Sequence, residues 1–163
     1  MKRIAIITTL VLLSSMAKAQ SCNTLCNENW WKSTTQTEFE TMLATADVNE
    51  RGKNGITTLF WASYFGTPEN VDALIAAGAA INALEIGGMT PQFWAALSGM
   101  PNSVDNVKVL VAAGANVNAR DLSQMTPLFW AEFPEIVVTL LAGGANVDAQ
   151  RYDGQTALFG LED

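Results

Sequence analysis

Histidine is missing from the 163-residue sequence, cysteine occurs only twice, and Lys and Arg together number nine against sixteen acidic residues. Without histidine the chain has no Ser-His-Asp or Cys-His nucleophile pair, and it lacks the commonest general base. Two thiols without histidine are too few for a zinc site. The acidic balance disfavours nucleic acid as a partner, because phosphate backbones and an acidic surface repel each other. We therefore expect no enzyme activity, no metal and no other cofactor.

The apolar run near the N-terminus is too short to span a membrane. It covers residues 4–13, which as a helix would rise about 15 Å, half the thickness of a bilayer core. Two basic residues precede it, and Ala17-Lys18-Ala19 follows with the small-x-small pattern of a cleavage site. We predict a signal peptide over residues 1–19 and export, most simply to a bacterial periplasm. Its removal would leave six basic and sixteen acidic residues, a net charge of −10.

The two cysteines, Cys22 and Cys26, lie just after the predicted cleavage site. In an exported chain such a pair favours a disulfide. Residues four apart on a helical turn have Cα atoms about 6 Å apart, within the range that a disulfide spans. The closed loop is small, so its stabilising effect should be at the low end of the usual range. A redox-active pair is the alternative.

A six-residue phrase recurs along the chain. Residues 57–62, 90–95 and 126–131 share the pattern Thr-x-x-Phe-Trp-Ala, and 156–159 is a partial fourth copy. The starts of these phrases are 33, 36 and 30 residues apart. A second phrase, opening Gly-Ala at Gly78, Gly114 and Gly144, follows at the same intervals of 36 and 30. Self-similarity at this period predicts a stacked-repeat architecture.

In these phrases the chain resembles ankyrin-repeat proteins, whose unit is a β-turn followed by two antiparallel helices with a Thr-Pro-Leu-His-x-Ala signature. The resemblance implies an all-α ankyrin-repeat solenoid whose turn tips form a row. It implies nothing about catalysis, because function depends on individual sites and not on the fold. One departure is consistent: the histidine of the signature is replaced by Phe60, Phe93, Phe129 and Phe159.

We expect the signal peptide to be followed by an irregular N-terminal cap over 20–49, which carries the Cys pair, and by repeats over 50–163. The repeats would be about 50–82, 83–118, 119–148 and a partial 149–163. In the cap, Thr35 and Glu38 have capping-box spacing, and Trp30 or Trp31 would cover the exposed end of the stack.

Repeat length predicts where the units differ. The second repeat has three extra residues between its helices, and the third is three short at the same place, so its first helix should be clipped and Pro134 should begin the second. The truncated last unit either caps the stack itself, which we favour, or leaves apolar surface for a partner or for self-association at the C-terminal end.

The tips and the first helices are where such repeats usually bind a protein partner. Apolar residues stand at turns where a neutral scaffold would prefer polar ones, and four of the six basic residues that follow the predicted signal peptide are at tips. The candidate partner-binding residues are Arg51, Lys53, Tyr64, Leu84, Ile86, Leu122, Glu132 and Tyr152. Alternatively, tip side chains such as Arg120 and Asp121 only tie neighbouring turns together.

Three Trp residues share one repeat position: Trp61, Trp94 and Trp130. Stacking would place them in a row on the first helices, where they could serve in binding or in packing between repeats. The leading hypothesis is a non-enzymatic periplasmic protein–protein interaction module that binds through the tips and the concave face. The alternative is an inhibitor or immunity protein that blocks a toxin or enzyme in the same compartment, which the acidity would suit.

Overall fold

Short helices arranged in pairs make up the part of the chain that the structure, a computed structural model, describes: residues 27–158. The predicted signal peptide and the Cys22–Cys26 pair lie outside these residues. The elements are α2 (Glu28–Ser33), α3 (Gln36–Leu43), η1 (Lys53–Gly55), α4 (Thr58–Phe65), α5 (Pro68–Ala76), α6 (Pro91–Ala96), α7 (Ser103–Ala112), η2 (Pro127–Trp130) and α8 (Pro134–Ala142). Within 27–158 the only β pairing is an isolated bridge between Gln150 and Thr156. The all-α ankyrin-type prediction is confirmed.

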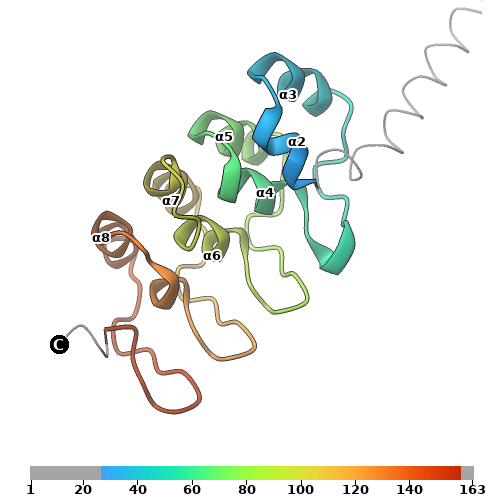
Figure 1. The fold of residues 1–163 in the computed structure, drawn as a ribbon. Helices are drawn as coiled ribbons and strands as arrows, with labels where there is room; N and C mark the ends of the chain where they lie inside the picture. Colours follow the sequence, from blue (N-terminus) through green and yellow to red (C-terminus); the bar gives the residue numbers. More distant parts are fainter. Residues whose placement is uncertain (1–26, 159–163) are drawn as a thin grey trace, which may run out of the picture.

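The helices stack in two layers (Figure 1). The second helices α3, α5, α7 and α8 succeed one another along the stack, and the first helices α2, α4 and α6 lie beside them. Each layer is held by contacts between neighbours, such as α4 with α6 and α5 with α7. The long turns between units all extend from the same side of the stack, so the tips form one edge.

The N-terminal cap is a helix pair that packs as the other units do. α2 contacts α4, and α3 contacts α5. The predicted capping box is present, since Thr35 and Glu38 each bond the other's backbone N–H. Trp31 and Phe39 are buried, with ring centroids 5.6 Å apart. The cap therefore extends the core of the repeats over the end of the stack, and it is more regular than the sequence suggested.

The first repeat shows why the phrase folds as it does. Leu59, Phe60 and Ala62 are fully buried on α4, as their spacing predicts. Thr67 then caps α5 through a capping box with Asn70, and proline occupies the first helical position. Gly78 ends the pair with φ of 88°, a left-handed conformation that favours glycine.

The predicted insertion and deletion are both confirmed. In the second repeat the connection between α6 and α7 runs through a loop that contains Gly99 at φ of 59°. In the third repeat the first helix is reduced to the four-residue 3₁₀ turn η2, and α8 begins at Pro134. The two irregular places meet, because the backbone N–H of Glu132 donates to the Ala96 carbonyl at 3.4 Å. The shorter repeat thus still packs against its neighbour.

Asparagines join successive units on the side of the turns. Asn49 donates from Nδ2 to the Gly78 carbonyl at 2.9 Å, and its Oδ1 accepts from the Ala80 N–H at 2.7 Å. Asn118 makes the same pair of bonds two units further along, to Gly144 and Asn146, at 2.9 and 2.7 Å. These bonds fix the spacing between units independently of the apolar core.

The C-terminal end of the stack keeps apolar surface exposed. Ile136 and Leu140 of α8 are fully buried, but Leu141, predicted on the buried face, is 40% exposed. The matching residues of earlier repeats, Ile75 and Val111, are partly buried because a further helix follows them.

A helix with the length and hydropathy of a membrane span is not found among residues 27–158.

Candidate functional site

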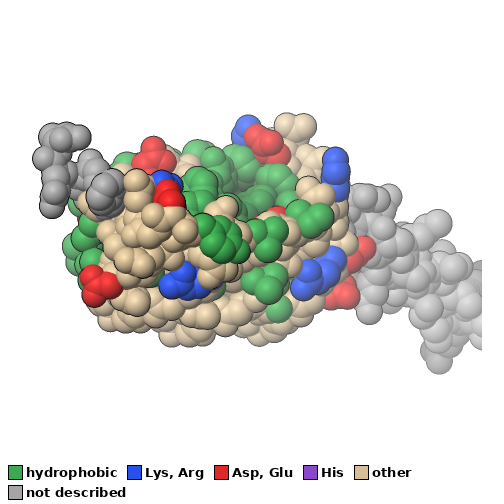
Figure 2. All heavy atoms as spheres, turned by 90° about the horizontal axis from the view of Figure 1, so that it is seen from below, with side chains coloured by type: hydrophobic (Ala, Val, Ile, Leu, Met, Phe, Trp, Pro, Cys, Tyr) green, Lys and Arg blue, Asp and Glu red, His purple; other side chains and the backbone are tan. Residues whose placement is uncertain are grey.

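Apolar side chains stand on every tip from the second to the fourth. Leu84 is 52% exposed, Ile86 73%, Leu122 67% and Tyr152 77%. Figure 2 looks at the molecule from the side of the turns and shows hydrophobic side chains gathered on this face, with Lys and Arg side chains beside them. The other candidate binding residues predicted on the turns, Arg51 and Lys53, are also exposed. We call the four apolar residues and their turns the tip edge.

The tips are bonded to one another. The Ile86 N–H donates to the Asn54 carbonyl at 2.9 Å, and the Leu122 N–H donates to the Gly87 carbonyl at 3.0 Å. These backbone bonds join the first three tips, and the bond from Arg120 to the Gln150 carbonyl joins the fourth, so the tip edge is connected and not a set of independent loops. A connected edge presents its apolar groups at fixed spacing, which lowers the entropic cost of binding a partner.

The tip arginines have a structural role. Arg51 Nη1 donates to the Leu84 carbonyl of the next tip at 2.8 Å, and Arg120 Nη1 donates to the Gln150 carbonyl at 2.8 Å. Asp121 is buried and accepts from the backbone N–H groups of Ser123 and Met125. The alternative that these side chains tie neighbouring turns together is therefore confirmed for Arg120, whereas Asp121 bonds only within its own turn. The alternative also describes the guanidinium of Arg51, whose place among the partner-binding residues stays a prediction.

An aromatic cluster lies on the first helices near the N-terminal end of the stack. It consists of Trp61, Tyr64 and Phe65 of α4 and Trp94 of α6. The Trp61 and Trp94 rings meet edge-on, 5.3 Å apart at 85°, and Tyr64 meets Trp94 at 6.2 Å and 80°. Phe65 is stacked on Trp61 at 6.0 Å and 12°. Tyr64, one of the predicted binding residues, is thus placed among three other rings.

Two hollows flank Trp61. One, of about 180 Å³, is lined by the aromatic cluster together with Glu28 of α2. The other, of about 280 Å³, is lined by Lys53, Asn54, Ile56 and Trp61, and therefore joins the first tip to the aromatic cluster. A third hollow of about 220 Å³ lies between the last two tips, beside Tyr152. The aromatic cluster is therefore recessed, whereas of the four apolar residues of the tip edge only Tyr152 adjoins one of these hollows.

Three ankyrin repeats, as described by the family model, match residues 16–121. The chain belongs to the ankyrin-repeat family. Ankyrin repeats are protein–protein interaction modules and generally non-enzymatic scaffolds, so a protein is the class of partner that the family indicates. No curated protein matches the chain.

Only two of the three Trp residues that share one repeat position are in contact. Trp61 and Trp94 touch, whereas Trp130 has no ring contact with any other described residue. All three are partly buried, and the indole nitrogens of Trp61 and Trp130 are buried without a hydrogen-bond partner within residues 27–158. The row therefore combines packing with partial exposure.

Where Phe replaces the histidine of the signature, buried threonine hydroxyls are left without a hydrogen-bond partner among the described residues. These are the hydroxyls of Thr57, Thr90 and Thr126, which open the three phrases. Phe60 and Phe93, three residues further on, are fully buried and carry no ring nitrogen that could bond these hydroxyls. The ankyrin core of this chain is thus more apolar than the signature implies.

Glu132 lies apart from the tips. Its carboxylate faces Gly99 in the loop that joins α6 to α7, at the end of the first helices away from the turns. It is exposed, but the structure does not bring it to the tip edge. Its role as a binding residue stays a prediction.

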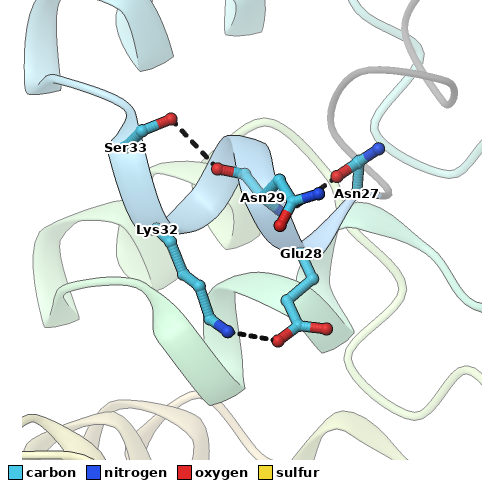
Figure 3. A network of polar contacts seen from close by, with 5 residues as sticks. All are labelled: Asn27, Glu28, Asn29, Lys32 and Ser33. Carbon is cyan, nitrogen blue, oxygen red and sulfur yellow. Dashed lines mark hydrogen bonds and ion pairs between the residues drawn. The ribbon is translucent and has the colours of Figure 1, made fainter.

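Glu28 is a site residue that was not expected from the sequence, because no helix was predicted over α2. Asn27 caps this helix, and Glu28 pairs with Lys32 one turn later (Figure 3). The signal was present as Asn at the N-cap followed by acidic and basic residues four apart.

No side-chain arrangement for catalysis is visible in residues 27–158. They contain no group of three or more Cys, Asp or Glu placed to hold a metal ion. The carboxylates with shifted pKa values are all exposed and have local causes. The side-chain bond from Arg151 lowers the pKa of Asp153, and the backbone and side chain of Thr35 lower that of Glu38. Neither group adjoins the aromatic cluster, so what the site offers is apolar and aromatic surface.

Proposed function

We propose that this protein is an exported, non-enzymatic interaction module that binds another protein through the tip edge and the aromatic cluster. One observation carries the proposal: Leu84, Ile86, Leu122 and Tyr152 are all more than half exposed on turns that hydrogen bonds hold in one edge. Exposed apolar groups that gather on one face mark interaction sites on soluble proteins. Tyr and Trp, which the site also presents, are enriched at binding hot spots.

Export, most simply to a bacterial periplasm, is supported by the N-terminal sequence. The basic start, the apolar run over 4–13 and the Ala17-Lys18-Ala19 pattern have the order of a signal peptide. Mass spectrometry of the protein from its native host should give a chain that begins at Gln20. The same measurement before and after reduction should show Cys22 and Cys26 joined. A full-length chain in the cytoplasmic fraction would contradict export.

The binding surface is tested by changing the apolar tips without touching the bonds that connect them. In one variant Leu84, Ile86, Leu122 and Tyr152 are replaced by Ser, while Arg51 and Arg120 are kept because they tie the tips together. The matched control replaces by Ser two exposed second-helix residues that belong to none of the proposed binding surfaces, Asp72 of α5 and Lys108 of α7. Crosslinking of each protein in periplasm should capture one partner with the native chain and the control, but not with the tip variant. Equal capture by all three would refute the tip edge.

Inhibition of a toxin or enzyme is the alternative function. It is favoured by the net charge of −10 that the chain would carry after signal-peptide cleavage, because such a field accelerates association with a basic target. An inhibitor steered in this way should lose association rate steeply between about 50 and 500 mM salt. Binding through the apolar tips should change little over that range.

Self-association at the C-terminal end is a separate proposal. Its support is the exposure of Val138 and Leu141 on α8, the last helix of the described residues. Sedimentation equilibrium would show a dimer that dissociates when both residues are replaced by Ser. A monomer at all concentrations would exclude it.

A further inference from the structure

The hollow beside α2 differs from the other hollows because one carboxylate stands among four aromatic rings. Its lining consists of Glu28, Trp61, Tyr64, Phe65 and Trp94. By comparison, the hollow between α7 and α8 is lined by Lys108, Pro134, Glu135, Val138 and Thr139. Both have an acidic group, but only the first has rings.

The rings face the hollow in different directions. Trp94 stands at 85° to Trp61 and at 80° to Tyr64, while Phe65 is within 12° of parallel to Trp61. Aromatic faces carry negative charge and their edges positive charge. The rings that line the hollow therefore lie in more than one plane, and a cation that enters the hollow is attracted to the ring face that it meets.

A cation from the protein itself already lies against this group. The ammonium of Lys32 lies 5.3 Å from the centroid of the Phe65 ring, within the range of a cation–π contact. The same ammonium pairs with Glu28, and both side chains are about half exposed, at 53% and 50%. Lys32 therefore shows that a ring and a carboxylate here hold positive charge together. It also competes for Glu28 with any cation that comes from outside.

The volume limits what fits. The hollow has a volume of about 180 Å³ and is lined by five side chains. That is room for one side-chain head group and not for a folded segment. An apolar head group would leave the Glu28 carboxylate without a charge partner other than Lys32, whereas a cationic one would satisfy both the rings and the carboxylate. The acidic balance of the whole chain favours the same sign.

We propose that this aromatic hollow binds one cationic side chain, lysine or arginine, of the protein partner. The proposal rests on the proposed function, since it identifies the chemistry by which the same site recognises its partner. The tip edge would supply apolar contacts and the hollow would fix the register by accepting a single charged residue. Lys32 would yield its place beside Glu28 when the partner's cation enters.

The test uses small probes, so it does not require the partner. Nα-acetyl-lysine amide and Nα-acetyl-arginine amide are titrated into the purified protein, with Nα-acetyl-norleucine amide as the uncharged analogue. The indole N–H resonances of Trp61 and Trp94 should move with the lysine or arginine probe and that of Trp130 should not. Binding of a cationic probe should be about tenfold tighter than that of norleucine. Equal binding of norleucine, or unmoved Trp61 and Trp94 resonances, would overturn the proposal.

Three surface variants sharpen the test without disturbing the core. Glu28→Gln should weaken the cationic probe about fivefold. Lys32→Met should strengthen it by a few fold, because the competing cation is gone; a purely apolar hollow would show no such gain. Glu135→Gln in the other hollow is the matched control and should leave binding unchanged. Loss of affinity in Lys32→Met, or no loss in Glu28→Gln, would contradict the proposed recognition.

Choline distinguishes the source of the cation. If choline binds more than about tenfold tighter than both amino-acid probes, the ligand is a free quaternary ammonium, and a partner side chain is excluded. Failure of the hollow and failure of the proposed function are also separable. Partner capture that depends on the tips but is insensitive to Glu28→Gln would overturn only the hollow. Probe binding without any captured protein would overturn only the interaction module.

Discussion

The first and third repeats begin with nearly the same phrase but fold to different lengths. Residues 57–62 lead into α4, an eight-residue α-helix, whereas residues 126–131 give the four-residue 3₁₀ turn η2. In both, a buried Thr precedes the helix and a buried Leu follows, Leu59 and Leu128. The phrase therefore determines where the helix starts and which residue enters the core. The number of residues before the next helix determines how far it continues.

This difference decides where the aromatic hollow can form. Tyr64 and Phe65 come from the last turn of α4, three and four residues after Trp61. The third repeat has no such turn, and three residues after Trp130 is Phe133, which already serves as the N-cap of α8. The same Trp is therefore part of a hollow in one repeat and stands without ring neighbours within residues 27–158 in the other. The third repeat, which is three residues short, therefore lacks the aromatic hollow of the first repeat but still packs in the stack.

The largest expected loss of stability comes from removing the Phe side chain of the repeated phrase in the longer helix, α4. Phe60 is fully buried, so Phe60→Ala should lower the free energy of unfolding by about 3–5 kcal/mol. Phe129 is only partly buried in η2, and Phe129→Ala should cost about half as much. Urea denaturation of both variants measures this. Equal losses would show that the clipped repeat is as tightly packed as the first.

The second repeat offers a gain of stability. Gln92 stands where the first and third repeats have Leu, is fully buried, and neither its Nε2 nor its Oε1 has a partner among the described residues. A buried unsatisfied polar group costs about 1–3 kcal/mol, so Gln92→Leu should stabilise the protein by about that amount. Leu59→Gln is the reverse control and should destabilise it. A destabilised Gln92→Leu variant would mean that the amide has a partner.

The asparagine bonds test whether the clipped repeat is joined as firmly as the first. Asn49 and Asn118 make equivalent bonds of 2.9 and 2.7 Å to the following unit. Replacing either by Ala should cost about 1 kcal/mol, because each change removes two ordinary hydrogen bonds at an exposed position. Thermal unfolding of the two variants compares the joints. A clearly smaller loss for Asn118→Ala would indicate a looser third repeat.

The smallest expected effect is the loss of stability at low pH that comes from protonation of Glu38. Bonds from the Thr35 backbone and hydroxyl lower the pKa of Glu38 below its ordinary 4.5. A lowered carboxyl pKa contributes stability that is present above the ordinary value and is lost as pH falls through the folded value. After correction for the intrinsic pH dependence of amide exchange, the protection of the α3 amides should therefore fall modestly below about pH 4.5 in the native chain. In Glu38→Gln that pH dependence should shrink, and an unchanged profile would contradict the assignment.

Much of the fold could be predicted because each repeat of the sequence can be aligned with the others. The intervals between phrases located the insertion and the deletion, and Thr67-Pro68 and Pro134 marked helix starts that the structure confirms. The apolar tips could also be found, since Leu84 and Tyr152 interrupt otherwise polar turns. These features depend only on local sequence and on the stacking of like units.

The rest depends on contacts that no local pattern reveals. The aromatic hollow needs α2 to pack against α4, which brings Glu28 to rings more than thirty residues away. The bond from Arg51 to Leu84 likewise joins two units, so a residue that looked free for a partner contributes to the edge. Leu141 was expected to be buried, and is exposed because no helix follows α8 within residues 27–158.

The central claim is that a partner binds the tip edge and the first helices, and not the second helices. Hydrogen–deuterium exchange of the protein with and without its captured partner tests it directly. The account predicts slower exchange at the tips around Leu84, Leu122 and Tyr152 and in α4 and α6, with α5, α7 and α8 unchanged. Slower exchange confined to α5, α7 and α8 would contradict it.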